Sequence, residues 1–310
     1  MGIQQTFETI KEGFNKIPTM GKVSLILAIL LLISIFAFRT KVEEGFTNST
    51  EFLLKEGPHI YDSFYASIYD TLVFDDVKND YEIGEIINNT SPTEHSVILD
   101  IGSGTGHHVG ALQKKGYNAY GLEISPDMIE EANQYYPSAK FVNGDALDSM
   151  IVSPESVSHI LCLNFTLYYI KDKTHFFQNC FKWLMPGGYL AIHLVNKERF
   201  DPILRVGNPL PLVAIQDYAK ERLTDTRAKF DGFEYKGHFE LLPNDMAQYK
   251  EVFINDKTGK VRQNNHVYYM EPQKKILEMA RNAGFILSSQ IELFNAGYDY
   301  QFVYVLQKPN

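Results

Sequence analysis

An apolar strand that runs directly into a glycine-rich loop is the feature of this sequence that most constrains its fold. Residues 97–106 read Val-Ile-Leu-Asp-Ile-Gly-Ser-Gly-Thr-Gly, with glycines at 102, 104 and 106. Because glycine has no Cβ, such a loop lets a ligand approach the backbone closely. The segment therefore predicts an open α/β sheet with a ligand site beyond the carboxyl end of this strand.

Strand-like and helix-like segments alternate from this point along the chain. Helical windows lie at 109–115, 125–136 and 175–184. Ser125 and Pro126 supply an N-cap and a first-turn proline for the second window. This alternation predicts a parallel sheet with helices on both faces. The strand-like runs lie at 97–101, 117–123, 139–143, 158–164 and 189–195.

The spacing of the glycines bears on which ligand the loop would bind. A dinucleotide fingerprint would place its third glycine at position 107, where this chain has His107. The spacing Gly-x-Gly-x-Gly, with Asp100 two residues before it, disfavours NAD. An NAD-binding oxidoreductase is therefore a disfavoured reading.

Four segments, in order, resemble the motifs of the class I S-adenosylmethionine-dependent methyltransferases. They are D-I-G-S-G-T-G at 100–106, G-L-E-I-S at 121–125, N-G-D-A at 143–146 and L-M-P-G-G at 184–188. The resemblance implies a Rossmann-like seven-stranded sheet of order 3-2-1-4-5-7-6 with an antiparallel strand seven. The final Y-Q-F-V-Y-V-L-Q-K, at 300–308, is placed to be that strand.

The resemblance also implies S-adenosyl-L-methionine as the cofactor. The glycine loop would face its methionyl part and ribose, and Asp100 would anchor that loop. Glu123 would accept from both ribose hydroxyls, and Ile124 would pack against adenine. Asp145 would accept from the adenine amine, with a helix cap as its alternative role. The full cofactor-binding set is Asp100, Gly102, Ser103, Gly104, Gly106, Glu123, Ile124, Asp145, Ala146 and Asn164.

Methyl transfer from a sulfonium is an in-line displacement, so the protein's main tasks are positioning and exclusion of water. A general base is needed only when the nucleophile arrives protonated. We take Asn164, Tyr69 and His266 as candidate catalytic residues, with Asn164 facing the reacting methyl. For His266, a strand histidine satisfied by its neighbours is an equally open reading.

A change of pattern after residue 196 indicates an insertion in the α/β domain. Residues 197–270 contain aromatic alternating stretches, and Asn255–Gly259 has the composition of a hairpin turn. We predict an antiparallel β cap over the active-site mouth. The cap and the segment before the glycine loop resemble small-molecule N-methyltransferases that act on nucleotide-linked amino sugars. The cap's rings either line an acceptor pocket or form its own core: Phe230, Phe233, Tyr235, Phe239 and Tyr249.

An uncharged segment near the amino terminus predicts a transmembrane helix over 22–39. Sixteen consecutive uncharged residues lie between Lys22 and Arg39, and at about 1.5 Å per residue they span roughly 24 Å. The two flanking side chains would reach the membrane interfaces. A buried core helix and a cleaved signal peptide are the alternatives. The predicted organisation is a tail at 1–21, the transmembrane helix, a linker at 40–58 and a methyltransferase domain at 59–310.

Charge and cysteine content narrow the set of partners. The net charge of −9 makes nucleic acid a poor partner, and the spacing of Cys162 and Cys180 suggests no zinc site. We expect a membrane-anchored methyltransferase whose small-molecule, lipid or membrane-associated acceptor has an N- or O-nucleophile. Its catalytic domain would lie on the cytosolic side, where the cofactor is made. A homodimer is left open, and a catalytically silent methyltransferase-fold interaction module is the alternative.

Overall fold

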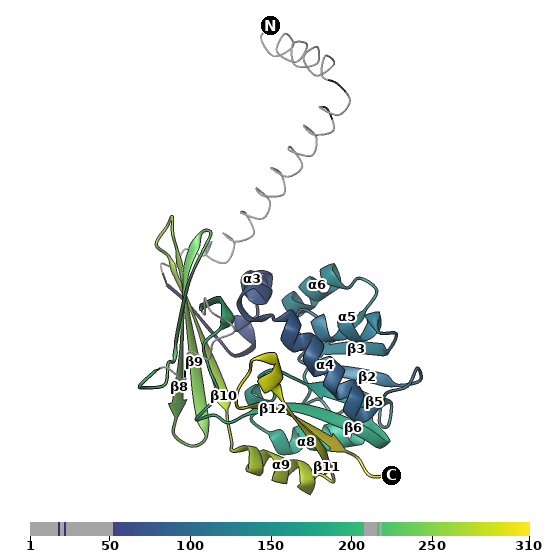
Figure 1. Cartoon of the computed structure of the whole chain (residues 1–310). Helices are drawn as coiled ribbons and strands as arrows, with labels where there is room; N and C mark the ends of the chain where they lie inside the picture. Colours follow the sequence, from purple (N-terminus) through teal and green to yellow (C-terminus); the bar gives the residue numbers. More distant parts are fainter. Residues whose placement is uncertain (1–17, 19–21, 23–51, 208–215, 217–218) are drawn as a thin grey trace. The chain divides into compact units, whose positions relative to one another are not determined.

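A computed structural model describes residues 52–207, 216 and 219–310 of the chain, together with Pro18 and Lys22 (Figure 1). The chain divides into two compact units, 1–47 and 48–310. The second unit contains one sheet of seven strands and one of five.

The larger sheet is made of β2 (Val97–Ile101), β3 (Asn118–Glu123), β4 (Lys140–Asn143), β5 (Val157–Cys162), β6 (Leu184–Val195), β11 (Ile286–Glu292) and β12 (Gln301–Gln307). Its spatial order is β4-β3-β2-β5-β6-β12-β11. β12 pairs antiparallel with both β6 and β11, whereas β2 to β6 pair in parallel. Numbered along the chain, this is the order 3-2-1-4-5-7-6 that the resemblance implies.

Helices cover both faces of this sheet. Side chains along its central strands point alternately to the two faces, and each face is the base of an apolar core. Ile98 and Leu161 face the core beneath α4 (Asp76–Thr90) and α5 (His107–Lys114). Leu99 and Cys162 face the other core, beneath α8 (Lys173–Trp183) and α9 (Gln273–Asn282). The parallel strands are therefore buried on both faces, as short apolar runs require. The remaining described helices are η1 (Gly57–Ile60), α3 (Ser63–Val73), α6 (Pro126–Tyr135), α7 (Thr166–Tyr169), η2 (Arg205–Gly207) and η4 (Leu293–Ala296).

The smaller sheet is largely the insertion that follows β6. It consists of β1 (Phe52–Glu56), β7 (Asp225–Phe230), β8 (Phe233–Leu242), β9 (Met246–Asn255) and β10 (Val261–Tyr269), in the order β1-β10-β9-β8-β7. β7 to β10 pair antiparallel. The turn between β9 and β10 lies where the sequence predicts it, and Asn255 Oδ1 fixes it by accepting from the backbone N–H groups of Lys257 and Thr258.

Residues 52–56 form a strand within the segment for which the sequence predicts a linker, 40–58. This strand, β1, pairs in parallel with β10, with Phe52 opposite Val261 and Glu56 opposite Asn265. Its five residues are too few to give a clear periodic signal, and only the free edge of β10 supplies partners for its backbone. Within the described residues, the folded unit thus begins before residue 59.

The prediction of a transmembrane helix is not confirmed by the residues that the structure describes. No helix among the described residues is long and apolar enough to cross a membrane. The longest of them, α4, has 15 residues, or roughly 22 Å at the helical rise, and buries one face against the sheet. Residues 23–39, on which nearly all of the prediction falls, lie outside the described residues.

Candidate active site

A cavity of about 600 Å³ opens beyond the carboxyl ends of β2, β3 and β5 and reaches the five-stranded sheet. Gly102, Glu123 and Asn164 line one side of it, and His266 of β10 lines another. A smaller cavity of about 50 Å³ adjoins it. The two cavities share Tyr69, Val73, Lys78, Gly102, Gly104 and Asn164.

The glycine loop, residues 102–106, is left-handed at all three of its glycines. A Cβ on Gly102 would lie 2.5 Å from Thr166 Cγ2, and one on Gly106 would lie 2.6 Å from Phe141 Cζ. A Cβ on Gly104 would come no closer than 3.5 Å to another heavy atom, because this residue faces the cavities. Gly106 lines neither cavity. Its absent side chain therefore serves packing, whereas Gly104 keeps space open for a ligand.

Glu123 presents its carboxylate at the end of β3, as predicted. It is only 7 % exposed, and its two oxygens accept from different backbone groups: Oε2 from the Gly104 N–H at 2.9 Å and Oε1 from the Ser125 N–H at 3.0 Å. Burial raises the pKa of this carboxyl, although these backbone N–H groups oppose the shift. Since a carboxylate oxygen has two lone-pair sites, each retains capacity for one hydroxyl donor. The geometry suits a ribose diol.

The other residues predicted to contact an adenosyl group follow in the same wall. Ile124 is 43 % exposed and lines the large cavity, so a flat ring could cover its side chain. Asp145 and Ala146 also line it. Asp145 Oδ1 accepts from the Leu147 N–H at 2.8 Å within a turn. No helix begins in the described segment between β4 and β5, so Asp145 is not the helix cap that was its alternative role.

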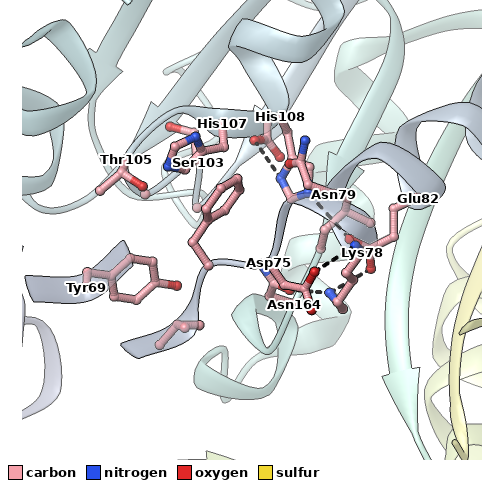
Figure 2. A pocket seen from close by; sticks show the side chains of 16 residues that line it. Tyr69, Asp75, Lys78, Asn79, Glu82, Ser103, Thr105, His107, His108 and Asn164 are labelled. Carbon is pink, nitrogen blue, oxygen red and sulfur yellow. Dashed lines mark hydrogen bonds and ion pairs between the residues drawn. The ribbon is translucent and has the colours of Figure 1, made fainter. Parts of the chain in front are cut away.

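The small cavity lies over a buried cluster of charged side chains (Figure 2). Lys78 Nζ lies 2.8 Å from Glu82 Oε1, and His108 lies between Glu82 and Asp100, at 3.5 and 3.6 Å. Burial lowers the pKa of His108, but the two adjacent carboxylates outweigh it and raise that pKa to about 9. Burial likewise opposes ionisation of Glu82, but Lys78 and His108 hold its pKa at about 2. Two cations and two anions therefore balance beneath the glycine loop.

Four buried polar atoms beside the small cavity have no hydrogen-bond partner among the described residues: Asp100 Oδ2, Asn79 Oδ1, Ser103 Oγ and Glu82 Oε1. Glu82 Oε1 is ion-paired with Lys78, and Asp100 Oδ2 lies 3.6 Å from the His108 ring. Leaving such atoms without a hydrogen bond is costly. Asp100 Oδ2 and Asn79 Oδ1 can only accept, so the chemistry of this cavity suits a ligand with N–H donors, such as the ammonium of a methionyl group. The predicted positions Asp100 and Ser103 thus fit the expected cofactor.

Asn164 lies where the two cavities meet, just beyond β5. Its φ of +51° is left-handed, a conformation that costs energy in a residue other than glycine and is frequent at functional sites. Lys78 Nζ donates to its side-chain oxygen, and His193 Nδ1 contacts its backbone oxygen. The amide of Asn164 is thereby held by α4, an arrangement that the sequence does not predict.

Another part of the lining of the large cavity, here called the tyrosine wall, brings His266 and Tyr69 together with further tyrosines and with Glu251. His266 is 3 % exposed; its Nε2 lies 2.8 Å from Glu251 Oε2 and its Nδ1 lies 2.6 Å from Tyr169 Oη. Tyr61 Oη donates to Tyr169 Oη at 2.8 Å. The tyrosine wall consists of Tyr61, Tyr65, Tyr69, Tyr169, Tyr249, Tyr268, Glu251 and His266.

The aromatic residues of the insertion divide between the two expected uses. Phe239 and Tyr249 line the large cavity. Phe233 and Tyr235 instead pack against Phe253 in the core of the five-stranded sheet, and Phe230 stacks on Phe233 with ring centroids 4.9 Å apart.

The sequence-based set does not include three charged side chains of the site: Lys78, Glu82 and Glu251. Lys78 and Glu82 have the i, i+4 spacing of a helical ion pair, which is a usable signal. Glu251 carries no such signal, because it meets His266 only where β9 and β10 pair in the fold.

Comparison with known proteins places these features in a family. Residues 99–192 match the model of the methyltransferase domain family. The chain is 28% identical over 219 residues to phosphoethanolamine N-methyltransferase of Plasmodium falciparum, covering 65% of this chain and 73% of that protein. It is 31% identical over 144 residues to the dTDP-4-amino-2,3,4,6-tetradeoxy-D-glucose N,N-dimethyltransferase of Saccharopolyspora spinosa, covering 44% of this chain and 57% of that one.

Solved structures share the fold. An S-adenosylmethionine-dependent methyltransferase from Clostridium acetobutylicum superposes with a TM-score of 0.60 at 16% identity, over 79% of this chain and 98% of that chain. At this identity the match concerns the fold alone.

Proposed function

Since this chain is a class I S-adenosylmethionine-dependent methyltransferase, we propose that its acceptor is the amine nitrogen of a small molecule bound in the large cavity. One observation carries the proposal: a single cavity joins Gly104 and Glu123 to the tyrosine wall. Two reactants can therefore be held in one enclosed space, as an in-line displacement requires.

S-adenosylmethionine, when bound, supplies a methyl group already activated on a sulfonium. The chain's own residues then have to bind, orient and exclude water. In this proposal the Glu123 carboxylate accepts from the ribose hydroxyls, and the Ile124 side chain covers one face of the adenine. Asp100 Oδ2 and Asn79 Oδ1 accept from the methionyl ammonium, which gives a hydrogen bond to two atoms that have none among the described residues.

The walls of the large cavity favour an amine over other nucleophiles. A cation near the faces of tyrosine rings is attracted by about 0.5–2 kcal/mol. Six tyrosines and the Glu251 carboxylate surround the far side of the cavity, so an amine that becomes more positive during methylation is stabilised there. The two relatives described above are named for N-methylation, which supports the same choice. Because the cofactor is made in the cytosol, the proposal also places the catalytic unit in contact with the cytosol.

Cofactor binding is tested by isothermal titration with S-adenosylhomocysteine. We expect Glu123→Ala to weaken binding by about 10- to 100-fold, because the diol loses an acceptor pair and a buried backbone N–H loses its partner. Glu130→Ala, which removes an exposed carboxylate from α6, is the matched control and should bind as the wild type does. Equal binding by both variants contradicts the assignment.

The acceptor is tested with radiolabelled S-adenosylmethionine and paired probes. Each amine, such as phosphoethanolamine or a nucleotide-linked amino sugar, is assayed beside the analogue in which a hydroxyl replaces the amino group. We expect label to appear on at least one amine and not on its hydroxyl partner. Labelling of the hydroxyl compounds alone would replace the amine with an oxygen nucleophile.

A further inference from the structure

We infer that Tyr61, Tyr169 and His266 form a proton relay that takes the proton of the acceptor during methyl transfer, with Glu251 fixing the tautomer of His266. This inference rests on the proposed function, because a relay is needed only for a nucleophile that arrives protonated. An amine is mostly an ammonium ion near neutral pH and must lose a proton before it can attack.

The relay is a continuous series of short hydrogen bonds that runs along the wall of the large cavity. Tyr61 Oη donates to Tyr169 Oη at 2.8 Å, and Tyr169 Oη lies 2.6 Å from His266 Nδ1. The opposite ring nitrogen, Nε2, lies 2.8 Å from Glu251 Oε2. Tyr61 comes from the segment before α3, Tyr169 from α7, and His266 and Glu251 from neighbouring strands of the insertion. Four separate parts of the chain therefore converge on one path.

The direction of proton movement follows from Glu251. This carboxyl is 1 % exposed, and besides His266 it accepts from Tyr65 Oη, Tyr235 Oη and Asn264 Nδ2 at 2.9–3.0 Å. Burial alone would raise its pKa, but His266 and these donors lower it. An ionised Glu251 can only accept, so His266 must carry a proton on Nε2. Nδ1 of the neutral ring is then a lone-pair acceptor facing Tyr169.

The two phenols have the protonation state that a relay requires. Burial, reinforced by neighbouring tyrosines, raises the pKa of Tyr61 and of Tyr169 well above the usual phenol value. Each hydroxyl therefore keeps its hydrogen at neutral pH, and each can pass that hydrogen on while it receives another. Tyr169 is closer to His266 Nδ1, at 2.6 Å, than to Tyr268 Oη, at 3.3 Å, so its hydrogen belongs to the bond with the imidazole.

The cavity end of the relay is held beside the cofactor-binding residues. The backbone oxygen of Tyr61 accepts from Ser125 Oγ at 2.6 Å, two residues after Glu123. Arg262, fully buried on β10, donates to both oxygens of Asp62 at 2.8 and 3.0 Å and to the Ile60 carbonyl at 2.9 Å. Both neighbours of Tyr61 are thus tied to the strand that carries His266. Tyr61 is the residue of the relay that would contact the acceptor.

In the proposed step, the acceptor nitrogen gives one proton to Tyr61 Oη and uses the freed electron pair to bond the methyl carbon, while the carbon–sulfur bond of the donor breaks. The Tyr61 hydrogen passes to Tyr169 Oη, and the Tyr169 hydrogen passes to His266 Nδ1. The proton ends on an imidazolium paired with the Glu251 carboxylate. Release of that proton to solvent, back through the two phenols, restores the starting state.

Among the described residues, the side chains whose rings contact the His266 ring are tyrosines. The titratable side chains that contact or face it come from η1 and its flank, α3, α7, β9 and β10, and Glu251 is the charged member. They are Tyr61, Tyr65, Tyr169, Tyr249, Tyr268 and Glu251. A proton on Nδ1 would stop the relay, because the ring would then have no lone pair to receive the hydrogen of Tyr169.

The tautomer of His266 is measured first, by nitrogen NMR of the full chain with ¹⁵N-labelled histidine and without any acceptor. His266→Gln identifies the two resonances. We expect Nε2 in the range of a protonated nitrogen and Nδ1 in the range of an unprotonated one, shifted upfield by its bond from Tyr169. Tyr169→Phe should move the Nδ1 resonance towards that of a free lone pair. Tyr304→Phe, a buried tyrosine outside both cavities, is the matched control.

The second measurement is kcat for whichever of the paired amine probes is methylated fastest. Tyr61→Phe, Tyr169→Phe and His266→Gln should each lower kcat by about 10²-fold or more, the usual contribution of a general base. The acid limb of the wild-type kcat profile should be lost in all three. Their affinity for S-adenosylhomocysteine should remain within about twofold, which separates the relay from cofactor binding. Tyr304→Phe should keep the wild-type kcat and profile.

Two results would overturn the relay. One is a proton on Nδ1 at neutral pH, because the imidazole would then donate to Tyr169 and could accept nothing. The other is a Tyr61→Phe enzyme with wild-type kcat and the wild-type acid limb. The first result needs no acceptor, so the relay can fail while amine methylation stands, and amine methylation can fail while the tautomer is as expected.

Discussion

The two sides of the large cavity are built in opposite ways. On the glycine-loop side, made of residues 102–106 with Glu123, Ile124 and Asp145, each contact is fixed by a turn that directly follows a strand. On the tyrosine wall, contacts join residues such as Tyr65 and Glu251, which are 186 positions apart. The first side is a local property of the sequence, and the second exists only in the completed fold. Cofactor binding and acceptor chemistry should therefore respond independently to mutation.

The largest expected effect breaks the glycine-loop side alone. Gly104→Val should weaken S-adenosylhomocysteine binding by more than about 100-fold, since it adds a branched side chain to a left-handed residue that faces both cavities. Titration calorimetry measures the loss. Gly116→Val is the matched control, because Gly116 is also left-handed at φ +90° but has open space around it. If both variants bind normally, the loop does not approach the ligand closely.

The next effect breaks the tyrosine wall alone. Glu251→Gln should lower the free energy of unfolding by about 2 kcal/mol, because one amide cannot accept from all the donors that now reach the carboxylate. Urea unfolding measures this change. Glu240→Gln, an exposed position on β8, should change it by less than about 0.5 kcal/mol. Cofactor affinity should hardly move. A parallel loss of that affinity would mean that the two sides are one cooperative structure.

The charged cluster beneath the glycine loop offers a pH test of the local side. His108 has a folded-state pKa of about 9, above its ordinary value near 6.5, so its stabilising contribution is complete below pH 6.5 and is lost as pH rises through 9. About 2 kcal/mol should disappear from the free energy of unfolding between pH 7 and 9.5. In His108→Gln this part of the decline should be absent, whereas His95→Gln, at an exposed position, should decline as the wild type does. A His108→Gln profile parallel to the wild type would show that the cluster is not ionised as described.

The smallest effect sharpens the comparison within the glycine-loop side. Ile124→Ala removes apolar surface that is 43 % exposed, so it should weaken S-adenosylhomocysteine binding by about 3- to 10-fold, equivalent to about 1 kcal/mol. Thermal stability should be nearly unchanged, because the side chain is not part of either core. Wild-type affinity would place the adenine elsewhere in the cavity.

The sequence predicts the glycine-loop side of the cavity better than it predicts the tyrosine wall. The glycine loop and the Ser125 cap are encoded within a few residues, so pattern and spacing predict them. The strand order is not local in this way, and its prediction rests on the resemblance to the methyltransferase family. The prediction for Gly106 is right about the loop but not about the ligand. The missing side chain at this glycine makes room for Phe141, and this contact between distant parts of the chain cannot be predicted from the spacing of the glycines.

The tyrosine wall shows where such reasoning stops. The chemistry of His266 marks it as a candidate base, but the sequence does not predict its contact with Glu251. In the register of β9 and β10, Tyr249 and not Glu251 lies opposite His266. The contact forms because the two side chains reach diagonally across the pair of strands. The helical spacing of Lys78 and Glu82 makes their ion pair predictable, but the bond from Lys78 to Asn164 depends on how α4 packs against the sheet.

The pairing of β1 with β10 has a consequence for biosynthesis. Phe52 leaves the ribosome 209 residues before its partner Val261, which at about 5–20 residues per second is a delay of roughly 10–40 s. During that interval the first strand has no edge to join, and the segment carrying Tyr61 has no Arg262 to hold it. The strands β2 to β6 can meanwhile assemble. The nascent chain should thus acquire affinity for its methyl donor before it acquires the means to use it.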